Sequence, residues 1–299
     1  MGMTRREVLR WLVAWSGALV TASPVHALAR LRPVRAFTPR LRAVQITDLH
    51  YGYRGSGNPD PAASLSQALY QIQQLNPELL LITGDLIEAD ADPRVRERRL
   101  EDIWERLQGL RIPLLAVPGE QDALMDAGAL WQRVVGPLHF HEASGGVHVI
   151  GLDNESRGFL LGRSERDWLA QELRSLDEGV PLLVAAHAPL AWYYPAWNWY
   201  TYDGPAASAM VARFPHRLFV HGHVHQLLTD EVGGVKGFGA RAVSFSYPLP
   251  DSRHALALMP IPMAAGAVDT GLGLRDIRFA GTFQITDRPL APLAGSVKP

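Results

Sequence analysis

The amino-acid sequence predicts an α/β fold, in which strands buried on both faces alternate with helices. Six short apolar runs recur between residues 41 and 225, and each of them ends in a cluster of polar residues. Continuous apolar runs of this length are typical of strands that are covered on both faces. We expect these strands at residues 41–46, 79–82, 112–117, 147–152, 182–186 and 218–220.

Helical patterns fill most of the gaps between these runs, which is the second observation behind the α/β prediction. The expected helices cover residues 61–75, 93–107, 164–176 and 205–214. The first ends at Asn76-Pro77, and the third begins at Ser164 with a capping-box-like pattern. Further short strands are expected at residues 243–247, 274–279 and 282–285.

Composition limits the classes of function. The chain has 299 residues, of which 47% are apolar and 20% charged, so it is long and apolar enough for a folded globular domain. The net charge is -1, so no basic surface predicts nucleic acid as a partner. There is no cysteine, and any metal ion must therefore be held by nitrogen and oxygen ligands.

The N-terminal residues have the layout of a secretory signal. Arg5 and Arg6 precede an apolar run at residues 11–20, and small residues with A-x-A-like cleavage sites follow. The arginine pair resembles the twin-arginine type, and the run is short for a membrane span, although a retained anchor remains an alternative. We therefore expect export to the periplasm by the twin-arginine machinery. The expected organisation is a signal peptide at 1–29, a linker at 30–40, one domain at 41–287 and a flexible tail at 288–299.

Seven side chains with nitrogen or oxygen donors stand at the ends of the predicted strands, where open α/β sheets bind their ligands. They are Asp48, His50, Asp85, Glu120, His187, His223 and His225. With added water, these seven donors suffice for two metal ions, provided that one carboxylate bridges the pair. The mixed donor set suits Mn, Fe, Zn or Ni and argues against an all-oxygen calcium site.

The same residues form an ordered set of motifs. In chain order they are Asp48-x-His50, Gly84-Asp85, Gly119-Glu120-Gln121-Asp122, His187 and Gly222-His223-x-His225. This set resembles the D-x-H, G-D, G-N-H-[DE], H and G-H-x-H motifs of the calcineurin-like metallophosphoesterases, and it spans residues 43–225. The resemblance implies a four-layer α/β/β/α sandwich of two facing mixed sheets. It further implies one metal ion on Asp48, His50 and His225, a second on Glu120, His187 and His223, and Asp85 as the bridge.

Two positions depart from the family pattern. Glu120 stands where the family has Asn, and as an anion it lowers the net positive charge of the site by one. Gln121 stands where the family has the His that assists catalysis, and an amide cannot transfer a proton at neutral pH. The catalytic acid is therefore unknown from the sequence. Arg54, in the glycine-rich loop after His50, is the candidate for contact with a phosphate oxygen of the substrate.

Residues 191–204, AWYYPAWNWYTYDG, interrupt the α/β pattern. They hold three of the eight Trp and four of the eight Tyr of the chain. Two interpretations remain open for this aromatic segment. It either forms a rim that packs on an organic group of the substrate, with Trp197 and Trp199 as candidates, or packs on the protein's own core.

Together these features predict an exported, metal-dependent phosphoric ester hydrolase. Two metal ions would hold the phosphoryl oxygens of a phosphomonoester or phosphodiester and activate water for in-line attack on phosphorus. The expected partner is a small-molecule or lipid phosphoester. Gln121 favours one alternative, a protein that binds phosphate or phospholipid with little turnover. A hydrolase of another substrate class with the same metal ions is the second alternative.

Overall fold

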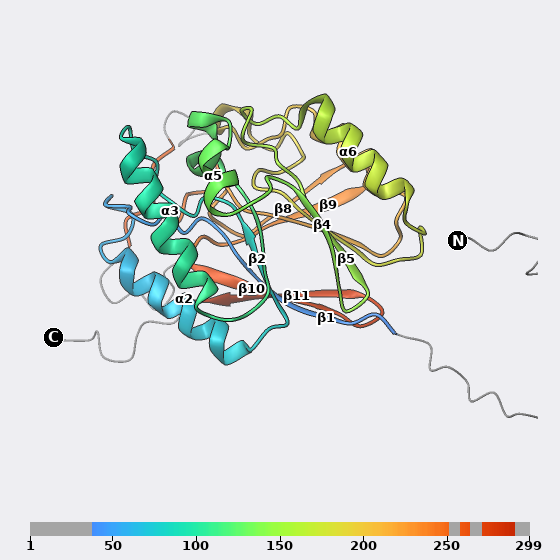
Figure 1. Ribbon diagram of the computed structural model, residues 1–299, viewed down its shortest axis with the longest axis horizontal. Helices are drawn as coiled ribbons and strands as arrows, with labels where there is room; N and C mark the ends of the chain where they lie inside the picture. The colour runs from blue at the N-terminus through green and yellow to red at the C-terminus, as the bar shows by residue number, and fades with distance from the viewer. Residues whose placement is uncertain (1–37, 251–257, 264–270, 291–299) are drawn as a thin grey trace, which may run out of the picture. The chain divides into compact units, whose positions relative to one another are not determined.

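The computed structural model describes residues 38–250, 258–263 and 271–290, and two mixed β-sheets form its centre (Figure 1). The first sheet has the strand order β11 (Phe283–Pro289), β10 (Gly273–Phe279), β1 (Leu41–Ile46), β2 (Leu79–Thr83) and β3 (Leu114–Val117). The second has the order β4 (Phe140–Ser144), β5 (Val147–Gly151), β6 (Leu182–Ala185), β7 (Arg217–His221), β9 (Val235–Gly239) and β8 (Leu228–Val232). Strands β1 to β3 are parallel to one another, as are β5, β6, β7 and β9.

The two sheets pack face to face because alternate residues of each strand point to opposite sides. On β1, Ala43 belongs to an apolar cluster that also contains Val149 and Val220 of the second sheet. The next residue, Val44, belongs to a different cluster on the outer face of the first sheet. Strands buried on both faces explain why the sequence shows continuous apolar runs.

Helices cover the outer face of each sheet and complete four layers. The helices on the first sheet are α2 (Pro61–Leu75), α3 (Pro93–Gln108) and α5 (Ala129–Val134). Those on the second are α6 (Gly162–Arg174) and α7 (Gly204–Val211). Figure 1 shows α2 and α3 on one side of the sheets and α6 on the other. The short elements are α4 (Glu120–Ala123), η1 (Leu124–Asp126) and η2 (Pro195–Trp197). The expected four-layer α/β/β/α architecture is thereby confirmed.

Several predicted elements differ from the structure by a few residues at their ends, and two of the differences have a visible cause. Helix α6 begins at Gly162 and not at Ser164, because the carboxylate of Asp203 accepts hydrogen bonds from the N–H groups of Leu161 and Gly162. Residues 243–247 do not form the expected strand. Their N–H groups at 243 and 244 donate to the carbonyls of residues 47 and 48, so the segment crosses the end of β1. Its apolar alternation reflects burial against that strand end.

The boundaries of the domain differ slightly from expectation. Strand β11 continues to Pro289 and Leu290 is buried, so the sheet extends beyond residue 287. The predicted signal peptide, most of the linker and residues 291–299 of the predicted tail lie outside the described residues. Within the described part of the chain, no helix has the length and apolarity needed to cross a membrane.

Candidate metal centre

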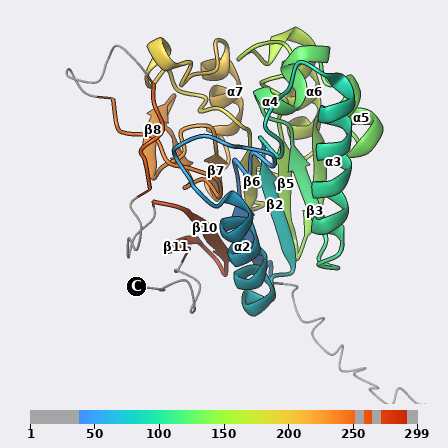
Figure 2. The same cartoon turned by 90° about the vertical axis from the view of Figure 1, so that its left-hand side faces the viewer.

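The carboxyl ends of the parallel strands of both sheets meet at one edge, and the loops there carry all seven predicted ligands. The first sheet supplies Asp48, His50, Asp85 and Glu120, and the second supplies His187, His223 and His225. Helices α4 and α7 lie at this edge, above the strands in Figure 2. The structure therefore brings together side chains that are up to 177 residues apart, from residue 48 to residue 225.

Five of these seven residues have a left-handed backbone conformation that non-glycine residues rarely adopt. The φ angles are 53° at Asp48, 42° at His50, 52° at Asp85, 67° at His223 and 54° at His225. Each such residue costs on the order of 1–3 kcal/mol, and strain of this kind collects at functional sites. The turns reverse the chain directly after β1, β2 and β7, which keeps the side chains at the strand ends.

Two motif glycines permit close approach of neighbouring loops. A Cβ atom at Gly119 would overlap the carboxylate of Asp85, and one at Gly222 would overlap the hydroxyl of Thr47. Any other residue at either position would push the loops apart. The glycines of the motifs therefore set the distances between the candidate ligands.

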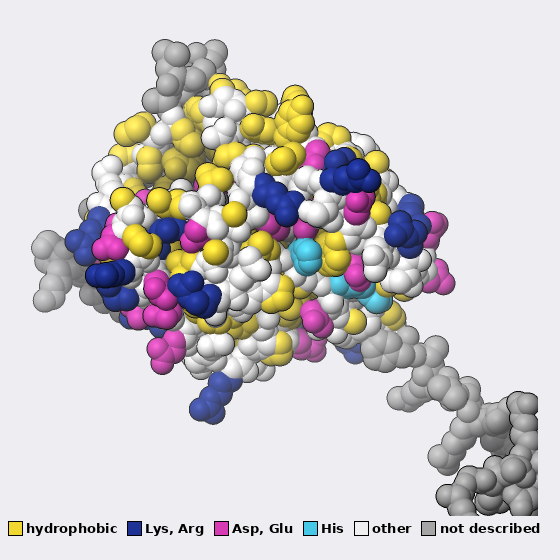
Figure 3. Space-filling view, turned by 45° about the horizontal axis from the view of Figure 1, so that its top comes forward, with side chains coloured by type: hydrophobic (Ala, Val, Ile, Leu, Met, Phe, Trp, Pro, Cys, Tyr) yellow, Lys and Arg dark blue, Asp and Glu magenta, His cyan; other side chains and the backbone are white. Residues whose placement is uncertain are grey.

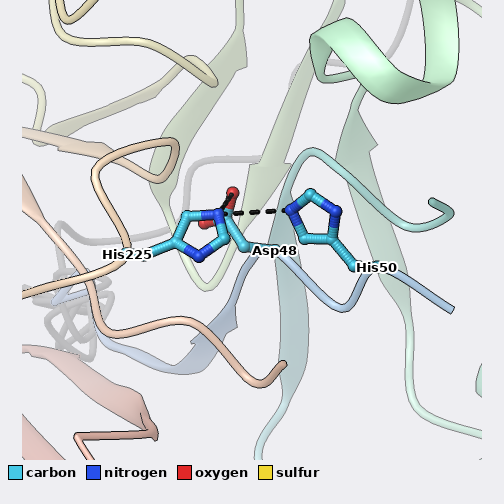
Figure 4. Close-up of side chains that lie close together, drawn as sticks. All are labelled: Asp48, His50 and His225. Atoms are coloured by element: carbon cyan, nitrogen blue, oxygen red, sulfur yellow. Dashed lines mark hydrogen bonds and ion pairs between the residues drawn. The ribbon is translucent and has the colours of Figure 1, made fainter. Parts of the chain in front are cut away.

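Asp48, His50 and His225 form the first ligand group (Figure 4). Oδ1 of Asp48 lies 3.2 Å from Nε2 of His225, and Nε2 of His225 lies 3.2 Å from Nε2 of His50. All three residues are buried. Asp48 and His50 lie in the loop after β1 of the first sheet, and His225 lies in the loop after β7 of the second sheet.

Glu120, His187 and His223 form the second ligand group. Oε2 of Glu120 lies 2.8 Å from Nε2 of His187 and 3.2 Å from Nδ1 of His223. The side chain of Glu120 is 17% exposed, so this group faces solvent more than the first does.

Asp85 lies between the two groups, as expected of a bridging carboxylate. Its Oδ2 is 3.4 Å from Nε2 of His50 and 3.6 Å from Nε2 of His187. Asp85 Oδ2 is buried without any hydrogen-bond partner. A buried polar atom left unpaired costs about 1–3 kcal/mol, and a cation between these donors removes that cost. The unpaired oxygen and the mixed nitrogen and oxygen donors therefore fit metal cations.

Hydrogen bonds fix the tautomer of all four imidazoles. The bonds run from His50 Nδ1 to Glu88 (2.7 Å), His187 Nδ1 to the Thr83 carbonyl (2.6 Å), His225 Nδ1 to the Phe245 carbonyl (2.7 Å) and His223 Nε2 to the Asn198 carbonyl (3.1 Å). Each acceptor requires the proton on the nitrogen that it faces, so the other nitrogen directs a lone pair into the centre. Imidazoles held in this way are typical of metal sites.

The electrostatics of the centre also favour bound cations. Burial raises the pKa of Asp85, and the neighbouring charge of Glu120 raises it further. Burial alone would lower the pKa of His50, but its bond to Glu88 and the charge of Asp85 raise it to about 9. Metal ligation requires the neutral imidazole, so a cation that binds here must displace a proton.

Glu88 and Phe245 also contact the centre, although the sequence motifs did not predict them. Glu88 follows Asp85 by three residues and holds His50 in place, and an acidic residue so close to a predicted ligand is a usable signal. The ring of Phe245 lies 4.9 Å from that of His50 and 4.4 Å from that of His225. Nothing in the local pattern marked Phe245, because the two imidazoles that it contacts are distant in sequence.

Gln121 has a structural role at the edge of the centre. Its N–H donates to Oδ1 of Asp85 at 2.9 Å, and its side-chain oxygen accepts from the N–H of Ala89 at 3.2 Å. The adjacent Asp122 accepts hydrogen bonds from the N–H groups of residues 86, 87 and 119. Burial and the charge of Asp85 raise the pKa of Asp122 to about 7. Both residues tie the loop after β2 to the start of α4.

The loop after β5 forms the wall beside the second ligand group. Oδ1 of Asn154 accepts from the N–H of His187 at 3.2 Å. Glu155 is fully buried and neither of its carboxyl oxygens has a hydrogen-bond partner. Burial and the charge of Glu120 raise the pKa of Glu155 well above its ordinary value. This buried carboxyl was not predictable from the sequence, because an acidic loop residue is ordinarily solvated.

The aromatic segment is divided between core and surface. Trp197 and Trp199 are buried in a cluster with Val224 and Leu228, which favours, for these two side chains, the interpretation that they pack on the protein's own core. The carbonyl of Asn198, the residue between them, accepts from Nε2 of His223 and connects the segment to the second ligand group.

Arg54, the predicted phosphate contact, is exposed in the loop after His50. Tyr53, the residue before it, stacks on Phe245 with ring centroids 4.3 Å apart, and this places the loop beside the first ligand group. Among the described residues, no hydrogen bond or ion pair is recorded for the Arg54 side chain. Its contact with a phosphate oxygen remains a prediction.

Comparisons with known proteins agree with this geometry. The family model described as calcineurin-like phosphoesterase matches residues 41–227. A probable cyclic nucleotide phosphodiesterase of Synechococcus is 30% identical, over 74% of this chain and 88% of that protein. A 3′,5′-cyclic-nucleotide phosphodiesterase of Nostoc is 25% identical, over 71% of this chain and 82% of that protein.

Among solved structures, a dimetal phosphatase from Danio rerio is similar in fold. Its TM-score is 0.62 at 13% sequence identity, and the match covers 85% of this chain and 97% of that one.

Proposed function

Because the chain belongs to the calcineurin-like phosphoesterase family and is a metal-dependent phosphoric ester hydrolase, we propose that it cleaves phosphodiesters with two metal ions. The first ligand group would hold one ion, the second ligand group would hold the other, and Asp85 would bridge the pair. The donor set suits Mn, Fe, Zn or Ni.

The position of Asp85 is the observation that carries the proposal. Its buried, unpaired Oδ2 lies within 3.6 Å of an imidazole nitrogen from each ligand group. One carboxylate oxygen placed between two sets of nitrogen and oxygen donors is the arrangement that a dinuclear site requires. The names of the relatives also favour a diester as the substrate.

Two bound cations would supply polarisation of the phosphoryl oxygens and activation of a water molecule near neutral pH. The chain's own residues orient the centre. Glu88 and the Phe245 carbonyl hold the imidazoles of His50 and His225 by their Nδ1 atoms. The N–H of Gln121 fixes the carboxylate of Asp85.

Gln121 indicates which leaving groups the centre can accept. Protonation of the departing oxygen typically contributes about 10²–10⁴-fold, and it matters most for alkyl alcohols. Gln121 cannot donate a proton, since its amide is neutral and its oxygen is bound to Ala89. Esters with a stable leaving anion are therefore expected to be better substrates than simple alkyl monoesters.

The test is hydrolysis of bis-p-nitrophenyl phosphate and of an alkyl monophosphate by the purified protein with added Mn²⁺. We expect cleavage of the diester, inhibition by a chelator, and much slower release of phosphate from the alkyl monoester. Faster hydrolysis of the alkyl monoester would contradict the proposed preference. The test is repeated with Fe, Zn and Ni in place of Mn. If neither compound is hydrolysed with any of these four metals, the proposed activity is contradicted.

Gln121 also favours a second candidate function, a protein that binds phosphate or phospholipid with little turnover. The buried Glu155 does not replace the missing donor in any contact that the structure records. Tight phosphate binding together with negligible hydrolysis of the aryl diester would favour this candidate.

We further propose export by the twin-arginine route, supported by Arg5, Arg6 and the apolar run at residues 11–20. Replacement of both arginines by lysine is expected to leave the precursor in the cytoplasm. An unchanged periplasmic yield of the double variant would contradict this proposal.

A further inference from the structure

Exposed apolar side chains gather around the metal centre. Ten large apolar side chains of the described residues are exposed, and nine of these lie in the segments that follow the carboxyl ends of the parallel strands, at the edge that carries the ligands. The nine are Leu124, Met125, Trp192, Tyr193, Tyr202, Leu227, Leu249, Met259 and Ile261. The tenth, Tyr70, lies on α2. Figure 3 shows hydrophobic side chains gathered on the upper part of the face in view. Clustered exposed apolar groups, unlike scattered ones, mark interaction surfaces.

A row of aromatic rings connects the second ligand group to this surface. The ring of Phe159 lies 5.5 Å from that of His223 and 6.0 Å from that of Tyr200. Trp192 follows at 5.9 Å from Tyr200, and Tyr202 lies 5.7 Å from Trp192. We call Phe159, Tyr200, Trp192 and Tyr202 the aromatic ladder. Its inner rings are half-buried, whereas Trp192 is 55% and Tyr202 63% exposed.

Aliphatic side chains flank the ladder from the first sheet. A Cβ atom at Gly158, the neighbour of Phe159, would lie 3.7 Å from Cδ1 of Leu124. Leu124 is 45% and Met125 54% exposed on η1, directly after the helix that begins with Glu120. The apolar surface therefore continues across both sheets around the second ligand group.

We propose that the enzyme takes an amphiphilic phosphodiester from a lipid surface, with the phosphate at the metal centre and the apolar part along the aromatic ladder. This inference rests on the proposed function, because the metal centre selects the phosphate. The ladder and its flanks select what is attached to that phosphate. Exposed Trp and Tyr side chains favour the boundary between lipid and water, since their rings are apolar and their tips polar.

The exposed aliphatic residues favour a lipid over a nucleotide as the attached group. A nucleobase is bound by stacking on an aromatic face, and the rings of the ladder are tilted or edge-on to one another instead of forming a slot. Leu124 and Met125 offer no ring face at all. An acyl chain has no preferred face, and it gains from any apolar surface that it covers.

The first experiment measures partition of the full chain onto phosphatidylcholine vesicles, which carry no net charge. The variant Met125→Ser/Tyr202→Ser removes apolar area from two exposed positions on different loops. The matched control is Tyr70→Ser, which removes an equally exposed ring from α2. We expect about a tenfold lower partition for the double variant and a change of less than twofold for the control. All forms retain the N-terminal residues, whose contribution cancels in the comparison.

The second experiment compares kcat/KM for p-nitrophenyl phosphodiesters that differ only in the second alcohol, which is ethanol, dodecanol or thymidine. We expect the dodecyl ester to exceed the ethyl ester by at least tenfold, and this ratio to fall towards one in the double variant. A higher value for the thymidine ester than for the dodecyl ester would overturn the lipid assignment. Equal partition of wild type and double variant would also overturn it. Hydrolysis of the ethyl ester separates the two proposals, because it tests the metal centre without the ladder.

Discussion

The two ligand groups use the same kinds of side chain in different surroundings. In the first, Asp48, His50 and His225 are buried, and the ring of Phe245 covers both imidazoles. In the second, the side chain of Glu120 is 17% exposed and that of His223 is 8% exposed. The first group is therefore a closed half of the centre, and the second is the half that a substrate can reach.

The hydrogen-bond acceptors that hold the imidazoles also differ between the two ligand groups. A carboxylate, Glu88, accepts from His50 in the first group, whereas a carbonyl of the aromatic segment accepts from His223 in the second. A carboxylate partner raises the basicity of the imidazole that it holds and thereby its affinity for a metal ion. We infer tighter metal binding at the first group and easier exchange at the second. Variants of Asp85, Glu88 and Gln121 distinguish the two ligand groups.

Replacement of Asp85 is expected to remove the metal ions from both ligand groups. Asp85→Ala deletes the oxygen that lies within 3.6 Å of an imidazole nitrogen of each group. Elemental analysis of the purified variant should therefore show loss of both metal ions. Asp90→Ala is the matched control, because Asp90 lies in the same loop and contacts Arg99 and the N–H of Asp92 but none of the candidate ligands. Full metal content in Asp85→Ala would show that the ligand assignment is wrong.

Replacement of Glu88 by Gln is expected to weaken the first group alone. The variant keeps the size of the side chain but removes the charge that holds His50 at 2.7 Å. Loss of such a partner typically costs about 10–100-fold in metal affinity. A titration with metal ions should show the tighter of two binding steps shifted by that factor, with the weaker step unchanged. An equal shift of both steps would mean that the two groups bind as one unit.

The sequence predicted the shared features of the two groups better than their differences. Strand ends and motif order located all seven donors, because the carboxyl ends of parallel strands meet at one edge whatever the loops do. The residues that surround the two ligand groups were not predictable from strand ends and motif order. Phe245 reaches His50 from a segment about 200 residues away, and the apolar pattern around it resembled a strand. The tryptophans of the aromatic segment looked alike, yet burial separated Trp197 from Trp192.

The smallest expected effect concerns Gln121, which lies next to the more exposed group. Gln121→His would place a proton donor beside Glu120, whose negative charge raises the pKa of a neighbouring imidazole. A well-placed donor contributes about 10²–10⁴-fold, mainly to esters of alkyl alcohols. The wild-type side chain is held by its hydrogen bond from the N–H of Ala89, so we expect a gain of less than about tenfold. The gain is measured as kcat/KM for a series of esters whose alcohols differ in pKa. Gln121→Met is the control, because it lacks both the amide and a transferable proton. Rates for alkyl esters should rise more than rates for aryl esters in the His variant only. A parallel change at every leaving group would mean that position 121 acts through the loop at residues 88–90, and that proton donation at this position is not part of the reaction.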